Sequence, residues 1–291
     1  MNNMYALSLS SSKRTYGPLE IEMASLSNAF SNLQSTPRMP ALFVGHGSPM
    51  NAITDNDYSR KWRQMGEELP VPKAILVVSA HWMTRGATLV HIGSNPKTIH
   101  DFGGFPPELF AQQYAAPGAP DFAQATIELL EESHAHSDER WGLDHGAWSV
   151  LIQMFPKADI PVYQLSLDLS KNLADHFKLA QEPKALREKG VLIIGSGNVV
   201  HNLRALNMNG QVFDWAAEFD QYMADAIATK NMGKVMEVGK LGRIAALAHP
   251  TIEHFLPILY PLAVMGDEEK VSFFNESIDL GSISMRSFLL S

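Results

Sequence analysis

The sequence contains no cysteine. Disulfides, iron–sulfur clusters and zinc sites built from thiolates are therefore excluded, and any transition metal must be held by nitrogen and oxygen ligands. The chain supplies eleven histidines, and the neutral imidazole ring binds iron, zinc, copper and nickel. What matters is whether these histidines come together in the fold.

Basic runs and long apolar runs are also absent. The chain carries 31 acidic against 23 basic residues, a net charge of −8, which argues against nucleic acid as a partner. No apolar stretch approaches the roughly 18 residues that span a bilayer, so we expect no membrane partner. We identify no signal peptide, and together with the lack of disulfides this favours the cytoplasm.

The composition and the order of the segments predict an N-terminal extension followed by one catalytic domain. Residues 1–38 are rich in Ser and Asn and poor in core-forming periodicity, so we expect them to form a flexible extension. Met23 or Met39 would also serve as a start. Across residues 39–291, strand-like and helix-like segments alternate without a linker or repeat. This predicts a single α/β domain with a mostly parallel central sheet flanked by helices.

Three apolar, strand-like runs each end in small residues, with a histidine at the end or close behind it. In open α/β sheets, ligands bind beyond the carboxyl ends of the strands. Histidines delivered to one edge of the sheet therefore predict one metal site there, and a site with open positions is catalytic rather than structural. The runs and their histidines are 41–44 with His46, 74–78 with His81, and 191–194 with His201.

A fourth candidate ligand, His254, follows Glu253 near the end of the chain. Thr251 is a suitable helix cap, which would place both side chains in the first turn of a helix. Adjacent residues on a helix point about 100° apart, so we expect one of the two to bind the metal and the other to support it. A histidine taken alone is more often structural than metal-binding, so the prediction of a metal site rests on the shared placement of these four.

Two further segments carry groups suited to a site. His145 lies in a glycine-flanked turn beside Asp144, where it serves as a hydrogen-bond donor, as an acid/base, or only as a turn residue. The loop 93–107 interleaves aromatic residues and glycines with His100 and Asp101, a composition that suits a lid or pocket wall. We assign no role to the remaining histidines His91, His134, His136 and His176, and His249 is ambiguous.

Six ordered motifs carry a resemblance to a known family. The chain resembles the class III extradiol ring-cleavage dioxygenases, and within them the 4,5-DOPA dioxygenase branch. The resemblance covers about residues 39–291. The motifs are GHGSP at 45–49, SAHW at 79–82, TIHDFGGFP at 98–106, LDHGAW at 143–148, SGNVVHNL at 196–203 and EHFLP at 253–257.

The resemblance implies one mononuclear divalent metal at the strand ends. Carried over by motif, His46, His81 and His254 are metal ligands, His201 is either a fourth ligand or the acid/base beside the metal, and His145 is a catalytic histidine on the substrate side. A histidine at position 254 departs from the two-histidine, one-carboxylate triad of many non-haem iron oxygenases. Fe(II) is expected for ring cleavage, and Zn(II) suits the same imidazole ligands.

The resemblance also implies the reaction. We expect an extradiol dioxygenase that takes a small catechol and O2 and breaks the ring bond next to the diol, with L-DOPA or a related catechol giving the seco product. One alternative is a zinc-dependent hydrolase in which the same metal activates water. Another is a non-catalytic binding protein of this fold, although such a protein has no need of the histidine set. The oligomeric state is open.

Overall fold

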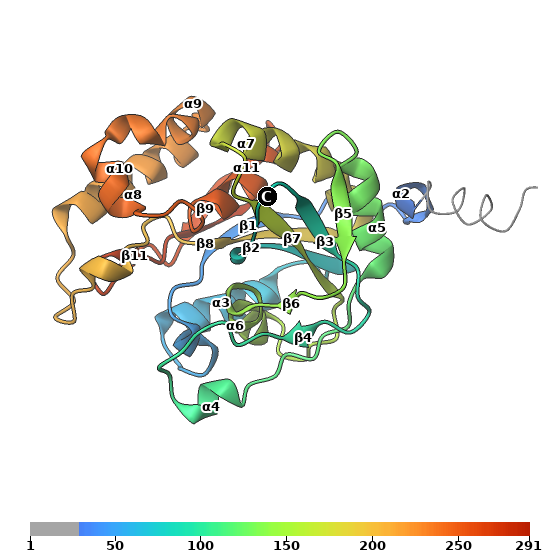
Figure 1. Cartoon of the computed structure of the whole chain (residues 1–291), viewed down its shortest axis with the longest axis horizontal. Coiled ribbons are helices and arrows are strands. Elements are labelled where there is room, and N and C mark those ends of the chain that lie inside the picture. Colours follow the sequence, from blue (N-terminus) through green and yellow to red (C-terminus); the bar gives the residue numbers. More distant parts are fainter. Residues whose placement is uncertain (1–28) are drawn as a thin grey trace, which may run out of the picture.

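A computed structural model describes residues 29–291, built around one eight-stranded sheet (Figure 1). Its strand order is β5-β3-β7-β2-β8-β1-β12-β9, and four of the seven neighbouring pairs are parallel. The predicted single α/β domain with a mostly parallel sheet is confirmed. The strands of this sheet are β1 (Ala41–Gly45), β2 (Ala74–Thr84), β3 (Thr88–His91), β5 (Ala135–Asp138), β7 (Val162–Asp168), β8 (Val191–Gly197), β9 (Val271–Phe274) and β12 (Ser287–Leu290).

Two small ribbons lie beside the main sheet: β4 (Lys97–Thr98) pairs with β6 (Gly142–Leu143), and β10 (Ile278–Asp279) pairs with β11 (Ile283–Ser284). No helix within residues 29–291 is long and apolar enough to cross a membrane. The helices are α2 (Ala29–Asn32), α3 (Asp57–Glu68), α4 (Pro107–Phe110), α5 (Pro120–Leu129), α6 (His145–Met154), α7 (Leu173–Gln181), α8 (Asp214–Ala228), α9 (Met232–Met236), α10 (Arg243–Ala248) and α11 (Leu259–Ala263). Short 3₁₀ segments lie at Pro49–Ala52, Glu182–Lys189, Leu203–Ala205, Val238–Leu241 and Leu256–Ile258.

The central strands are apolar throughout because helices cover both faces of the sheet (Figure 1). In β2, Leu76 and Val78 face the core formed with α5, α7, α8 and α11. The alternate residues Ile75 and Val77 face the core formed with α3 and α6. All four side chains are buried, so the middle of the sheet is a rigid frame from which the strand ends project.

Several boundaries follow from local chemistry. Helix α3 begins at Asp57 because Asn56 caps it: the Asn56 side chain accepts from the backbone N–H of Ser59. Helix α7 ends at Gln181, and the chain continues as a 3₁₀ segment containing Pro183, which lacks an N–H to donate.

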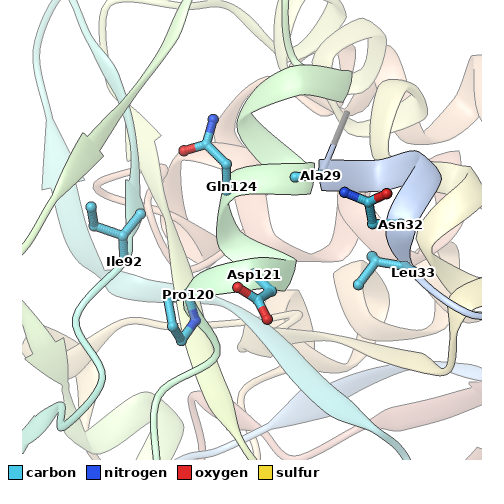
Figure 2. A pocket seen from close by; sticks show the side chains of 7 residues that line it. All are labelled: Ala29, Asn32, Leu33, Ile92, Pro120, Asp121 and Gln124. Carbon is cyan, nitrogen blue, oxygen red and sulfur yellow. The ribbon is translucent and has the colours of Figure 1, made fainter. Parts of the chain in front are cut away.

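The described part of the predicted extension, residues 29–38, is tied to the domain. The backbone N–H of Ala29 donates to the carboxylate of Glu128 on α5 at 3.0 Å, and Arg38 donates to the carbonyl that follows α11 at 3.1 Å. A cavity of about 430 Å³ is lined by residues of α2 and α5, and no histidine lines it (Figure 2). Residues 1–28, the greater part of the predicted extension, lie outside the described residues.

His176 on α7 is a buried histidine with both ring nitrogens partnered. Nε2 lies 3.1 Å from the carbonyl oxygen of Asp168 and must donate to it, so Nδ1 accepts from the Tyr260 hydroxyl at 3.1 Å. Burial lowers the pKa of His176 to about 4. The ring is therefore neutral in the folded protein at pH 7.

This neutral histidine makes the fold sensitive to acid. In the unfolded chain a histidine titrates near pH 6.5, so between pH 6.5 and 4 the unfolded state binds a proton that the folded state does not. The free energy of unfolding should therefore fall with decreasing pH in that window, by up to about 1.4 kcal/mol per pH unit from His176. Urea titrations of metal-free protein at pH 7, 6 and 5 should give a shallower pH dependence for His176→Gln than for the wild type. The exposed His136→Gln is the control, and an equal slope in all three proteins would contradict this expectation.

Candidate metal centre

Strands β1 and β8 place the first histidine. They run parallel with Gly45 opposite Gly197, and the backbone N–H of His46 continues the pairing to the Gly197 carbonyl at 3.1 Å. Nδ1 of His46 lies 3.0 Å from the Ser196 hydroxyl, which itself donates to the Gly146 carbonyl at 2.5 Å. Since that hydroxyl has only one hydrogen, it accepts from Nδ1–H, and Nε2 of His46 is left with a free lone pair.

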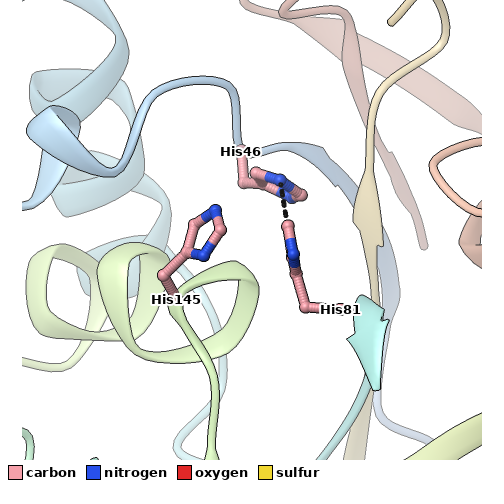
Figure 3. Close-up of side chains that lie close together, drawn as sticks. All are labelled: His46, His81 and His145. Carbon is pink, nitrogen blue, oxygen red and sulfur yellow. Dashed lines mark hydrogen bonds between the residues drawn. The ribbon is translucent and has the colours of Figure 1, made fainter. Parts of the chain in front are cut away.

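His81 lies inside β2 rather than beyond its end. The sequence predicted that the strand would stop before this residue, but β2 continues to Thr84, and its register against β7 shifts between Val78 and Met83. Such an irregularity redirects side chains, and here it accompanies a His81 ring whose Nε2 lies 3.2 Å from Nε2 of His46 (Figure 3).

Asp101 joins two of the histidines. One carboxylate oxygen lies 3.2 Å from Nδ1 of His81, and the other lies 3.0 Å from Nδ1 of His145 and accepts from the His145 backbone N–H at 2.9 Å. Burial alone would raise the pKa of Asp101, but the contacts with both histidines outweigh it and lower that pKa to about 2. A carboxylate beside both Nδ1 atoms favours the tautomers that carry Nδ1–H towards Asp101 and a lone pair on Nε2.

His145 is the first residue of α6, and a buried carboxylate fixes this helix start. Asp144 caps the helix and accepts from the Ser79 hydroxyl at 2.6 Å and from the Gln164 amide at 2.9 Å. Gly146, which follows His145, must be glycine because a Cβ there would lie 2.4 Å from the Ser79 hydroxyl oxygen. The turn is thus packed against β2 and β7, and His145 is aimed at His46 and His81 (Figure 3).

His254 and Glu253 lie in a turn, not in the helix that Thr251 was predicted to cap. The following 3₁₀ segment begins only at Leu256. The turn is held because the His254 carbonyl accepts from the backbone N–H of Asn198 at 2.9 Å. A Glu253 carboxylate oxygen lies 3.1 Å from Nδ1 of His254, an arrangement that supports this ring and leaves its Nε2 free.

His201 stacks on His254, with ring centroids 3.4 Å apart and the planes inclined by 7°. Its place is fixed by an antiparallel bridge to Ile283 and by its backbone N–H, which donates to the Ala248 carbonyl at 2.9 Å. The His254 ring lies 5.4 Å from that of His46 and 5.1 Å from that of His81. The structure therefore brings together all five histidines that the sequence singled out.

The electrostatics of the cluster suit a metal. Burial lowers the pKa values of His46 and His254 well below the ordinary value, with neighbouring histidines adding to the effect. Burial likewise lowers the pKa values of His81 and His201 to about 4. The rings are thus neutral near pH 7, which is the form of imidazole that binds a transition metal. This donor set fits one divalent ion.

The ligand atoms form two separate groups that share no residue. Nitrogens of His46, His81 and His145 lie within 4.8 Å of one another, and so do ligand atoms of His201, Glu253 and His254. Sequence reasoning placed His145 on the substrate side, whereas the geometry also allows it to reach a metal. Asp101 was noted only as part of a loop, because nothing in the sequence reveals that this loop folds back onto His81.

A cavity of about 550 Å³ opens onto the cluster. All five histidines line it, and so do Phe102 and Phe105 from the loop 93–107, which was predicted to form a lid or pocket wall. The edge of the Phe102 ring meets the His145 ring at a centroid distance of 5.5 Å. The cavity therefore offers a flat molecule an apolar wall opposite the imidazoles.

The chain is similar to known proteins in both sequence and structure. Residues 36–285 match the family described as the catalytic LigB subunit of aromatic ring-opening dioxygenase. The chain is 46% identical to the 4,5-DOPA dioxygenase extradiol of Escherichia coli K12 over 262 residues, covering 88% of this chain and 96% of that one. The 4,5-DOPA dioxygenase extradiol of Beta vulgaris is 39% identical over 256 residues, covering 84% of this chain and 94% of the relative.

A solved structure shows the same fold. The crystal structure of the uncharacterized protein JW3007 from Escherichia coli K12 superposes with a TM-score of 0.76 at 41% identity. The match covers 87% of this chain and 100% of the other.

Proposed function

Since the chain belongs to the family of the catalytic LigB subunit of aromatic ring-opening dioxygenases, we propose that its histidine cluster holds one Fe(II) ion at which O2 cleaves the ring of L-DOPA or a related catechol. Membership makes the protein a metal-dependent extradiol dioxygenase, with a catechol and O2 as its substrates. The choice of metal, the identity of the catechol and the roles of the individual residues are the proposal.

The observation that carries the proposal is the orientation of three imidazoles. His46, His81 and His254 each have Nδ1 held by a neighbouring oxygen, and each therefore has Nε2 free to bind a metal. Partners of this kind fix both the tautomer and the ring plane of a metal ligand. We assign these three residues as the metal ligands.

His201 and His145 are the remaining imidazoles of the site. His201 lies face to face with His254, beside the metal position, and acts as a fourth ligand or as an acid/base. His145 keeps Nδ1 against Asp101, so Nε2 is the basic atom on the cavity side. We assign His145 to take a proton from the catechol hydroxyl, because a neutral imidazole is the side chain suited to this near pH 7.

Fe(II) held by His46, His81 and His254 would supply the redox chemistry that ring cleavage by O2 requires. The side chains of the protein contribute by positioning the catechol. Phe102 and Phe105 pack on the face of the catechol ring and keep water from the reacting atoms. His145 receives the proton that the diol loses. Zn(II) fits the same ligands but has no redox chemistry, so a zinc-loaded protein would be inactive in ring cleavage.

The relatives' names suggest the substrate. Both relatives are named 4,5-DOPA dioxygenase extradiol, and the cavity has room for a catechol with a side chain. L-DOPA is therefore the first candidate, cleaved next to the diol to give the seco product. We further propose the cytoplasm as the location, because the chain has no disulfides and disulfides are rare in that compartment.

Reconstitution with iron tests the proposal. Metal-free protein loaded with Fe(II) under anaerobic conditions and then exposed to air with a catechol should take up one O2 per catechol and give a yellow product. Zn(II)-loaded protein is the control and should show no O2 uptake. An oxygen electrode and absorbance spectra measure both. The proposal fails if the iron-loaded protein cleaves none of a panel of catechols while the zinc-loaded protein hydrolyses an ester or amide.

A further inference from the structure

The charges around the cavity are all of one sign. Among its described lining residues there is no lysine and no arginine, and the only carboxylates are Asp101 and Asp279. Asp101 is engaged by two histidines at the cluster. Arg204, the cation nearest along the chain to this wall, is exposed and does not line the cavity. A substrate with a negatively charged tail would therefore meet no cationic side chain among the described lining residues.

Asp279 is the uncommitted carboxylate. It lies in the β10–β11 ribbon, is half-buried, and uses one oxygen to accept from the backbone N–H of Leu280 at 2.9 Å. Its carboxylate forms no ion pair with any side chain in residues 29–291. Burial raises the pKa of Tyr58, and the negative charge of Asp279 raises it further. The charge of Asp279 therefore acts on a neighbouring side chain.

The wall near this carboxylate is apolar. Leu203, Leu206 and Met208 line the cavity and are 62%, 40% and 80% exposed. Leu280 and Ile283 line it from the ribbon that carries Asp279. Between the histidine cluster and Asp279 there is thus space for an apolar linker with a charged group at its far end.

We propose that the site selects catechols whose side chain carries an ammonium group on a short apolar linker, and that Asp279 is the residue that receives this group. The inference rests on the proposed ring cleavage and names its substrate class. L-DOPA satisfies it by turning its ammonium to Asp279 and its carboxylate to solvent. Catechols with a carboxylate as their only tail charge are the disfavoured class, because that charge would lie near Asp279 without a counterion.

Two substrates with the same ring and opposite tail charges test this selectivity. For the iron-loaded wild type at pH 7, kcat/KM should be about tenfold higher for dopamine than for 3,4-dihydroxyphenylacetate. In Asp279→Asn this ratio should fall by about fivefold, the size expected for one partly exposed ion pair. The matched variant Asp159→Asn removes a charge from an exposed site outside the cavity and should leave the ratio unchanged.

Opposite results overturn the proposal. It fails if the wild type prefers the acid, in particular if Arg204→Gln then removes that preference, or if Asp279→Asn and Asp159→Asn change the ratio equally. The neutral substrate 4-methylcatechol separates this from failure of ring cleavage itself: its cleavage shows that the enzyme works, whatever the ratio. If no catechol is cleaved, calorimetric binding of dopamine and of the acid to zinc-loaded protein measures the charge preference alone, and tighter binding of the acid would refute it.

Discussion

Replacing His81 by alanine is expected to leave the protein with less than about a tenth of the wild-type metal and no O2 uptake with a catechol. The Nε2 atom of His81 faces that of His46 at 3.2 Å, and Asp101 lies beside Nδ1 of the same ring, so alanine removes a ligand from the centre of the proposed set. Even partners behind a metal ligand are worth about 10- to 100-fold in affinity, and loss of the ligand itself should cost more.

His145→Ala separates binding from catalysis. It should retain the metal while kcat falls by about 10²- to 10⁴-fold, the usual contribution of a general acid or base. Mass spectrometric metal analysis and an oxygen electrode measure the two effects on the same samples, with the exposed His136→Ala as the control. Because His145 also lies within reach of a metal, loss of metal from this variant would make it a ligand and overturn its assignment to the substrate. The same test on His201→Ala decides whether that residue is a fourth ligand.

Asp101→Asn is expected to weaken metal binding and turnover together, each by about 10- to 100-fold. One carboxylate oxygen lies 3.2 Å from Nδ1 of His81, and the other lies 3.0 Å from Nδ1 of His145. An asparagine keeps one acceptor and turns an NH2 donor towards the other ring. One of the two histidines must then flip its tautomer and present N–H instead of a lone pair at Nε2.

Metal titration and steady-state kinetics across Asp101→Asn, Asp101→Ala and Asp159→Asn measure this effect. Asp159 is exposed and remote from the cluster, so its variant should behave as the wild type. Wild-type metal affinity and kcat in Asp101→Asn would show that the carboxylate does not set the tautomers.

The sequence predicted the parts of the site that depend on local pattern. A buried strand that ends in glycine, histidine and glycine is recognisable without neighbours, and β1 begins and ends close to the predicted residues. Helix α3 was predictable for the same reason, since its apolar spacing and polar start are local. Four histidines near the ends of such elements were therefore identifiable, and the fifth, His145, stood out through its glycine-flanked turn.

The parts that depend on contacts between distant segments were not predictable. His81 was expected beyond a strand, but pairing with β7 extends β2 past it. His254 was expected in a helix, but its carbonyl is taken by the N–H of Asn198, and the chain forms a turn. Asp101 had no visible role because its partners come from β2 and from the start of α6.

The hydrogen bonds from His46 through Ser196 to Gly146 tie β1, β8 and α6 together directly behind the metal position. The histidines of the cluster lie between residues 46 and 254, so no short fragment of the chain contains them all. Metal occupancy therefore depends on the whole domain being folded, and the bound ion stabilises the folded state. At a free metal concentration 100 times Kd, this linkage adds about 2.7 kcal/mol to the free energy of unfolding. Iron supply would then govern how long the protein survives as well as how fast it works.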